Sequence, residues 1–138
     1  MYDVQLIAKY IIHRHALPIN NPKLQQILYF VQAEFLVSMN RACFTDDIEA
    51  WDHGPVVPAV YFQYLIFDSA NIPDQGHDGF EVISRQDKNH LDAIIDTAAK
   101  YSASWLEKIT LRQAPWKNAY KRDNKVIKNS ELKEYFSS

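Results

Sequence analysis

The sequence predicts a mainly α fold, a compact single-domain helical structure with a small two-stranded β element. Most of the 138-residue chain consists of segments with apolar residues at the three- and four-residue spacing of amphipathic helices. Pro- and Asn-containing breaks separate these segments, and only short stretches look like strands. The length is sufficient for one buried core, so we expect residues 1–138 to form one domain.

Two helices are expected in the N-terminal part of the chain. The first follows Asp3 as its N-cap and ends before Pro18. The second has Asn21 as its N-cap and Pro22 at its first helical position, where the missing N–H of proline is harmless. Apolar residues lie on more than one face of this second helix, so we expect it to be central and packed on several sides.

The middle of the chain contains the expected β element. A short strand is predicted at Ile48–Trp51, and its predicted partner is Phe80–Ser84, after a loop rich in turn residues. Between the two strands, a helix is predicted to start at Pro58 and to run to about Phe67.

Four further helices are expected in the C-terminal part. The longest carries Leu and Ile residues in phase and is capped by Ser84 or Asp87. A short helix follows with Ser102 as its N-cap, and the next has Pro115 in its first turn. Ser130 is the expected cap of the last helix.

The composition excludes several classes of function. The 3 glycines form neither a GxGxxG nor a GxxxxGK loop, so we expect no nucleotide cofactor. Cys43 is the sole cysteine, which excludes an internal disulfide and a Cys-cluster zinc site. The 5 histidines do not have the spacing of a metal-ligand set. We therefore expect no metal, no cofactor and no catalytic residues; a reactive Cys43 with a distant His is disfavoured because free Cys is usually a small buried hydrophobe.

The sequence has neither a secretory leader pattern nor an apolar run long enough to span a bilayer. The predicted location is therefore cytoplasmic, with no membrane partner. The formal net charge is −2, but acidic residues dominate between 46 and 96 and basic residues between 108 and 133. Such polarity is typical of two solvated faces and can also steer a charged partner.

The basic C-terminal third mixes cationic side chains with Trp116 and Tyr120. This combination of phosphate-seeking charge and aromatic rings makes a nucleic-acid-binding regulator one hypothesis. The slightly acidic chain and the lack of a separate helix-turn-helix argue against it, so binding of nucleic acid is not our first expectation. The residues expected to form this electrostatic surface are Lys117, Lys121, Arg122, Lys125 and Lys128.

The segment AWDHGPVVPAVY, residues 50–61, is the most unusual part of the chain. Two prolines fix backbone φ angles, and Gly54 permits a conformation or a close approach that a side chain would forbid. Trp51 and Tyr61 offer large, rigid contact area at its ends. Two interpretations remain open: a binding corner, or a tight strand-to-helix turn with Trp51 in the core.

Three segments of the chain carry a resemblance to a known family. KLQQILYFVQAEFL, IEAWDHGPVVPAVYFQY and PWKNAY, in this order and spacing, resemble the Panacea domain of the SocA-like and GepA-like phage-associated proteins. The EAWxxGPVVPxVY pattern is the specific part, and the resemblance covers nearly the whole chain.

The resemblance implies an antitoxin of a bacterial or prophage toxin–antitoxin system, which neutralises a cognate protein toxin by direct binding. Toxins paired with such domains include small alarmone synthetase-like enzymes. A proteolytic adaptor that delivers a toxin to the ClpXP protease is the other function implied. Many relatives carry an additional DNA-binding domain in front, and this sequence begins with its first helix, so we expect no transcriptional repression by it alone.

Within this family interpretation, a set of residues is expected either to bind the partner or to shape the corner as a scaffold. Gly54 is the member most strongly expected to be structural. The set comprises Trp51, Gly54, Pro55, Val56, Val57, Tyr61 and Trp116.

Overall fold

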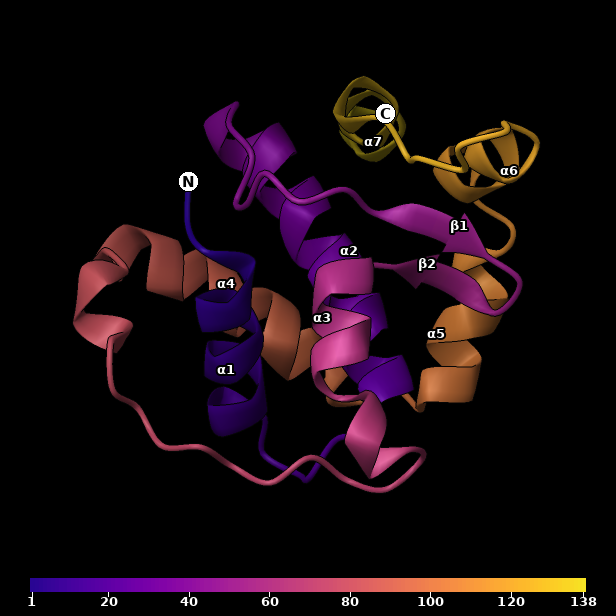
Figure 1. Ribbon diagram of the computed structural model, residues 1–138. Coiled ribbons are helices and arrows are strands. Elements are labelled where there is room, and N and C mark those ends of the chain that lie inside the picture. The colour runs from indigo at the N-terminus through magenta and orange to yellow at the C-terminus, as the bar shows by residue number, and fades with distance from the viewer.

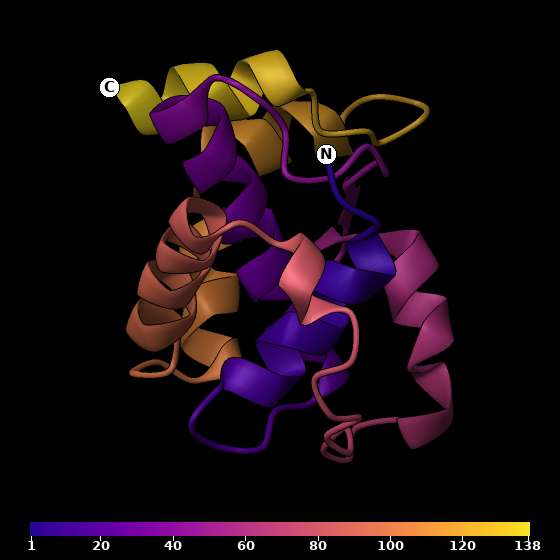
Figure 2. The same ribbon diagram turned by 90° about the vertical axis from the view of Figure 1, so that its left-hand side faces the viewer.

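A computed structural model describes residues 1–138, and helix α2 (Asn21–Met39) runs through its centre (Figure 1). Around it pack α1 (Val4–Arg14), α4 (Arg85–Ala98) and α7 (Asn129–Ser137). In the orthogonal view, α1 lies between α3 and α4, while α6 and α7 cover the opposite end of α2 (Figure 2). The predicted central position of the second helix is confirmed.

The remaining elements form the other side of the molecule. Strands β1 (Glu49–Trp51) and β2 (Gly54–Val56) form the antiparallel two-stranded sheet. Helix α3 (Pro58–Gln63) follows at once, and single 3-10 turns occupy Leu65–Phe67 and Phe80–Val82. The C-terminal part adds two short helices beside the sheet, α5 (Ala103–Thr110) and α6 (Ala114–Tyr120).

The hydrophobic core gathers around α2 and is continuous. Tyr29 and Phe35 of α2 are fully buried, as is Phe44 in the loop that follows. Leu132 of α7 is also fully buried, so the last helix is part of the same core. The mainly α fold class with a small β element is confirmed.

The helix caps agree with the sequence at three of the expected positions. The side chains of Asp3, Ser84 and Ser102 accept backbone N–H groups at the starts of α1, α4 and α5. Two expected caps are wrong. Asn20, not Asn21, caps α2, because its Oδ1 accepts the N–H of Lys23 at 3.1 Å. Helix α7 begins at Asn129, before Ser130, and has no side-chain cap.

The predicted partner of the first strand is also wrong. Phe80–Val82 is a 3-10 turn, and β1 instead pairs with Gly54–Val56 across the two-residue turn Asp52–His53. The expected helix from Pro58 likewise ends at Gln63, and a separate 3-10 turn continues the path. The physical reason for the strand pairing lies in the backbone of the hairpin, described below.

No helix of the structure is both long and apolar enough to cross a bilayer.

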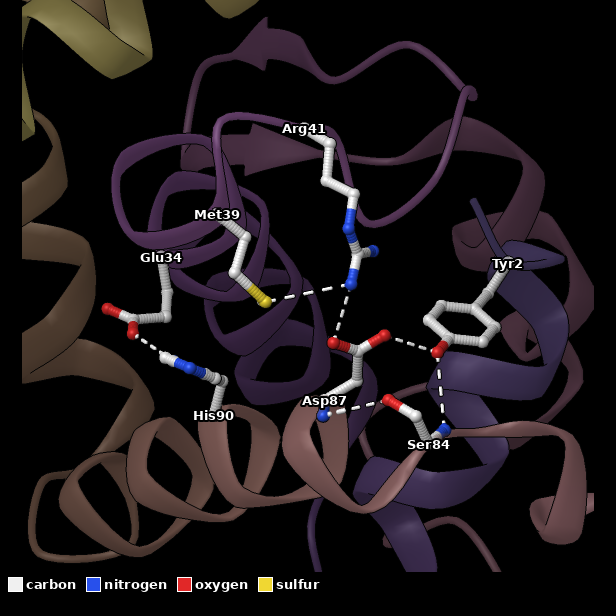
Figure 3. Close-up of polar contacts among 7 residues, drawn as sticks. All are labelled: Tyr2, Glu34, Met39, Arg41, Ser84, Asp87 and His90. Carbon is white, nitrogen blue, oxygen red and sulfur yellow. Dashed lines mark hydrogen bonds and ion pairs between the residues drawn. The ribbon is translucent and has the colours of Figure 1, made fainter.

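A buried carboxylate ties three segments of the chain together (Figure 3). Asp87, at the start of α4, is 2% exposed; it accepts a hydrogen bond from the Tyr2 hydroxyl and is paired with Arg41 Nη2 at 2.6 Å. Burial alone would raise the pKa of Asp87, but the hydrogen bonds from Arg41 and Tyr2 outweigh it and lower the pKa below its usual value. The Asp87 carboxylate thereby connects α4 with the N-terminal segment, through Tyr2, and with the loop that follows α2, through Arg41.

We expect Asp87→Asn to lower the free energy of unfolding at pH 7 by about 2 kcal/mol, since it removes a buried, charge-assisted pair. The lowered folded-state pKa means that the stabilisation by Asp87 is complete above about pH 4 and is lost as the pH falls through that pKa. The measurement is urea unfolding of both chains between pH 2.5 and 7. Asp96→Asn is the control; Asp96 pairs with Arg14 at an exposed position, so a loss under about 0.5 kcal/mol is expected. If both variants lost the same free energy of unfolding, the buried Asp87 pair would not be more stabilising than the exposed Asp96 pair.

Candidate functional site at the hairpin corner

The hairpin β1–β2 is bonded on both edges of β1. Ala50 lies opposite Pro55, and its N–H points away from β2 to donate to the Lys125 carbonyl at 2.7 Å. The N–H of Ile127 donates to the Ile48 carbonyl at 2.8 Å on the same edge. In an antiparallel ladder this orientation makes Ala50–Pro55 a non-hydrogen-bonded pair, so the missing N–H of Pro55 costs nothing.

Gly54 occupies a position that no other residue adopts without strain. Its φ is +129°, and a Cβ there would lie 2.7 Å from Gln26 Nε2. The backbone of the turn therefore rests directly on the side chain of Gln26 in α2. Glycine permits both this backbone conformation and this close approach.

Side-chain amides of α2 hold the segment after the hairpin. Gln25 Oε1 accepts the N–H of Val57 at 2.8 Å, and Gln25 Nε2 donates to Asn21 Oδ1 at 2.9 Å. Asn21 Nδ2 then donates to the Tyr61 carbonyl at 3.0 Å. These buried hydrogen bonds fix the distance between α2 and the first turn of α3.

The aromatic residues of the corner pack edge to face. The Trp51 and Tyr61 rings lie 5.1 Å apart between centroids, and Tyr61 lies 5.4 Å from Phe62. Trp116 Nε1 donates to the Trp51 carbonyl at 2.9 Å, so α6 supports the end of β1. Trp51, Tyr61 and Trp116 are half-buried.

The structure thus brings together all seven predicted corner residues and divides them into two kinds. Gly54, Pro55, Val56 and Val57 are buried and build the corner. The three aromatic residues retain exposed surface. Which of them contacts a partner stays a prediction.

Beside the corner lies a hollow of about 750 Å³, which we call the hairpin hollow. It is lined from α2, the hairpin, α3, α5 and the segment after α6. Its lining consists of Pro22, Gln25, Gln26, Trp51, Asp52, His53, Pro55, Val56, Tyr61, Ala103, Glu107 and Lys125. Its volume lies in the range of sites that bind small molecules.

Two of the polar residues in the hollow, Gln26 and Glu107, were missed by the sequence analysis. Gln26 is 4% exposed, and its Oε1 has no hydrogen-bond partner. Glu107 Oε1 lies 3.3 Å from Nδ1 of His53, a side chain that is 90% exposed. A signal for Gln26 existed, because a glutamine pair interrupts the apolar face of the central helix. No sequence signal pointed to Glu107, because it lies in α5 and comes close to the other lining residues only in the folded chain.

The basic residues of the C-terminal third have two different roles. Arg122 pairs with Glu131 at 2.6 Å and donates to the Val126 carbonyl. Lys125 Nζ donates to the Tyr120 carbonyl at 2.8 Å and lies 4.3 Å from the centre of the Tyr120 ring. Of the expected electrostatic surface, the exposed residues free of ion pairs are Lys117, Lys121 and Lys128.

Cys43 is fully buried after α2. Burial raises the pKa of its thiol to about 12. The thiol is therefore protonated at neutral pH and is a poor nucleophile. No group of three or more His, Cys, Asp or Glu side chains is arranged to hold a metal ion.

Comparison with known proteins assigns the family. The sequence model of the "Antitoxin SocA-like, Panacea domain" family matches residues 24–117, and the chain belongs to this family. This stretch contains most of α2, the hairpin, and the chain as far as Lys117 in α6.

One curated relative is Antitoxin SocA of Caulobacter vibrioides (strain NA1000 / CB15N). It is 39% identical over 62 residues, which cover 43% of this chain and 33% of that protein. The chain thus matches about a third of the length of this relative. No solved structure matches the chain.

Gly54→Ala is expected to lower the free energy of unfolding by about 2–3 kcal/mol, from backbone strain and the contact with Gln26. Gly76→Ala is the matched control. Gly76 also has a positive φ, of +86°, but no atom lies within 4 Å of the added Cβ, so only about 1 kcal/mol is expected. Thermal and urea unfolding measure both. If the two variants were equally destabilised, the close contact with α2 would not be important.

The thiol of Cys43 is expected to resist modification in the folded chain. At pH 8 an aromatic disulfide reagent should label it at least about 100-fold more slowly than in denaturant, because the thiol is buried and protonated. Absorbance of the released thiolate measures the rate. Rapid labelling of the native protein would show that the Cys43 thiol is accessible and reactive, as a nucleophilic role requires.

Proposed function

We propose that this protein is an antitoxin that neutralises a cognate protein toxin by binding it directly, without catalysis of its own. Membership of the antitoxin SocA-like family supports the antitoxin role. The protonated, buried Cys43 supports a role that does not use a nucleophile. The toxin bound is a protein whose active site or substrate-binding surface this chain covers.

The observation that carries this proposal is the rigid aromatic corner. Trp51 and Tyr61 flank a backbone that is restricted by Pro55 and by the Gln25–Val57 hydrogen bond, with Gly54 in the positive-φ conformation of the turn. Aromatic side chains that are already held in place lose little entropy on docking. Such residues dominate the binding energy of many protein interfaces.

Exposed apolar side chains follow the corner along the chain. Phe62 is 60% exposed and packs on Tyr61, and Ile66 in the following 3-10 turn is 85% exposed. Leu65 between them is also exposed. A group of large exposed apolar side chains is typical of a protein-binding surface, and Phe62 places part of this group against Trp51 and Tyr61.

Two alternatives give different results in the same experiments. A nucleic-acid-binding regulator would use the basic third, but Arg122 and Lys125 are engaged within the chain, which leaves fewer free cations for phosphate. A proteolytic adaptor would bind the toxin as well, but the toxin would then disappear in a protease-dependent manner.

Co-expression with the toxic product of the adjacent gene is expected to restore bacterial growth and to yield a stable complex. Trp51→Ala and Phe62→Ala should each weaken the complex by at least about 30-fold, as interface hot spots do. Calorimetry of the purified complex measures the affinity, and growth measures neutralisation.

Lys117→Glu with Lys121→Glu is the control, since both side chains are exposed and lie outside the lining of the hairpin hollow. The proposal fails if growth is not restored. If only the lysine variant loses binding, the basic surface and not the corner is the binding surface, and neutralisation by direct binding stands. Loss of toxin that depends on ClpXP would identify the adaptor.

A further inference from the structure

We propose that the hairpin hollow is an arginine pocket, which receives one arginine side chain of the protein that this chain binds. The inference rests on the proposed function for the identity of the partner. The chemistry of the pocket itself comes from its walls, its carboxylates and one unpaired amide.

The walls of the hollow suit a flat cation on an aliphatic stem. Trp51 and Tyr61 supply aromatic rings, and Pro22, Pro55 and Val56 supply apolar surface. A guanidinium stacks on aromatic rings and is more weakly hydrated than an ammonium, while its methylene stem covers apolar surface. The hollow therefore favours arginine over lysine.

The charge at the hollow favours a cation. Glu107 and Asp52 both line it. The carboxylate of Glu107 is 34% exposed, and its partner His53 is an exposed side chain that an arriving arginine displaces at little cost. Asp52 accepts the hydroxyl of Tyr120, a hydrogen bond that leaves its negative charge in place.

The cation already present does not neutralise these carboxylates. Lys125 also lines the hollow, but its ammonium donates to the Tyr120 carbonyl and lies over the Tyr120 ring. It forms no ion pair with Glu107 or Asp52. The acidic groups are therefore left for a ligand.

Gln26 supplies the specific polar contact. Its amide lines the hollow, its side chain is almost completely buried, and its Oε1 has no donor among the groups of the protein. This oxygen is itself shielded from solvent, but the last torsion of glutamine is broad and roughly twofold, so the amide can turn over to present Oε1 to the hollow. A guanidinium, with five N–H donors, can bond Gln26 and Glu107 together.

The test is a titration of the full chain with capped single amino acids, followed by NMR of the Trp51 indole N–H and the Gln26 side-chain amide. N-acetyl-arginine N-methylamide is expected to shift both signals with a dissociation constant of about 1–10 mM, appropriate to so small a probe. The capped citrulline analogue, a neutral isostere, should bind at least about tenfold more weakly, because it lacks the charge. The capped lysine analogue should also bind more weakly.

Two variants test the assigned groups. Glu107→Gln and Gln26→Leu should each weaken the arginine probe by about tenfold, whereas Asp47→Asn, an exposed carboxylate remote from the hollow, should leave it unchanged. Equal binding of arginine and citrulline overturns the proposal. The proposal is also overturned if the arginine probe shifts neither the Trp51 nor the Gln26 signal, or if Glu107→Gln binds the probe as tightly as the unchanged protein.

The pocket and the proposed function fail in different ways. If the wild-type chain binds the toxin, and Glu107→Gln and Gln26→Leu bind it with wild-type affinity, the arginine pocket is wrong and neutralisation stands. If the arginine probe binds as expected but growth is not restored, the pocket stands and the antitoxin proposal falls.

Discussion

The side-chain amides of α2 are the constraint on which the irregular half of the structure depends. Gln25 accepts the N–H of Val57, while Gln32 donates to the Phe44 carbonyl and accepts the N–H of Cys43. Each of these amides is buried and bonds backbone groups that lie outside the helices and strands. An unpaired amide at that depth would be costly, so the loop after α2 and the entry to α3 are each restricted to one path.

The position of the proposed binding surface follows from this arrangement. The hairpin is held from beneath by α2, at its free edge by residues 125–127, and at its end by Trp116. Its exposed aromatic side chains are therefore carried on rigid backbone, and the hollow beside them has a fixed shape. A surface of this kind is better suited to recognition than to a reaction that needs movement.

Features that depend on local sequence pattern, the helices and most of their caps, could be predicted. Features that depend on contacts between residues far apart in the sequence could not. The helices and the caps at Asp3, Ser84 and Ser102 follow from apolar periodicity and short-range hydrogen bonding. The pairing of β1 with Gly54–Val56 was missed because glycine and proline disfavour a strand. Pro55 is tolerated there because it lies opposite Ala50 in a non-hydrogen-bonded pair. The corner residues were identified, but the grouping of Gln26 with Glu107 required α2, the hairpin and α5 to be placed together.

The hairpin hollow takes its walls from α2 at one end of the sequence and from Lys125 near the other. Local unfolding of the hairpin, of α5 or of the segment after α6 removes part of it, so only the complete fold is competent to bind. Any occupant therefore adds its binding free energy to that of folding, by mass action. At a concentration 100 times its dissociation constant, this amounts to about 2.7 kcal/mol. The bound protein is consequently harder for a cellular protease to open than the free one.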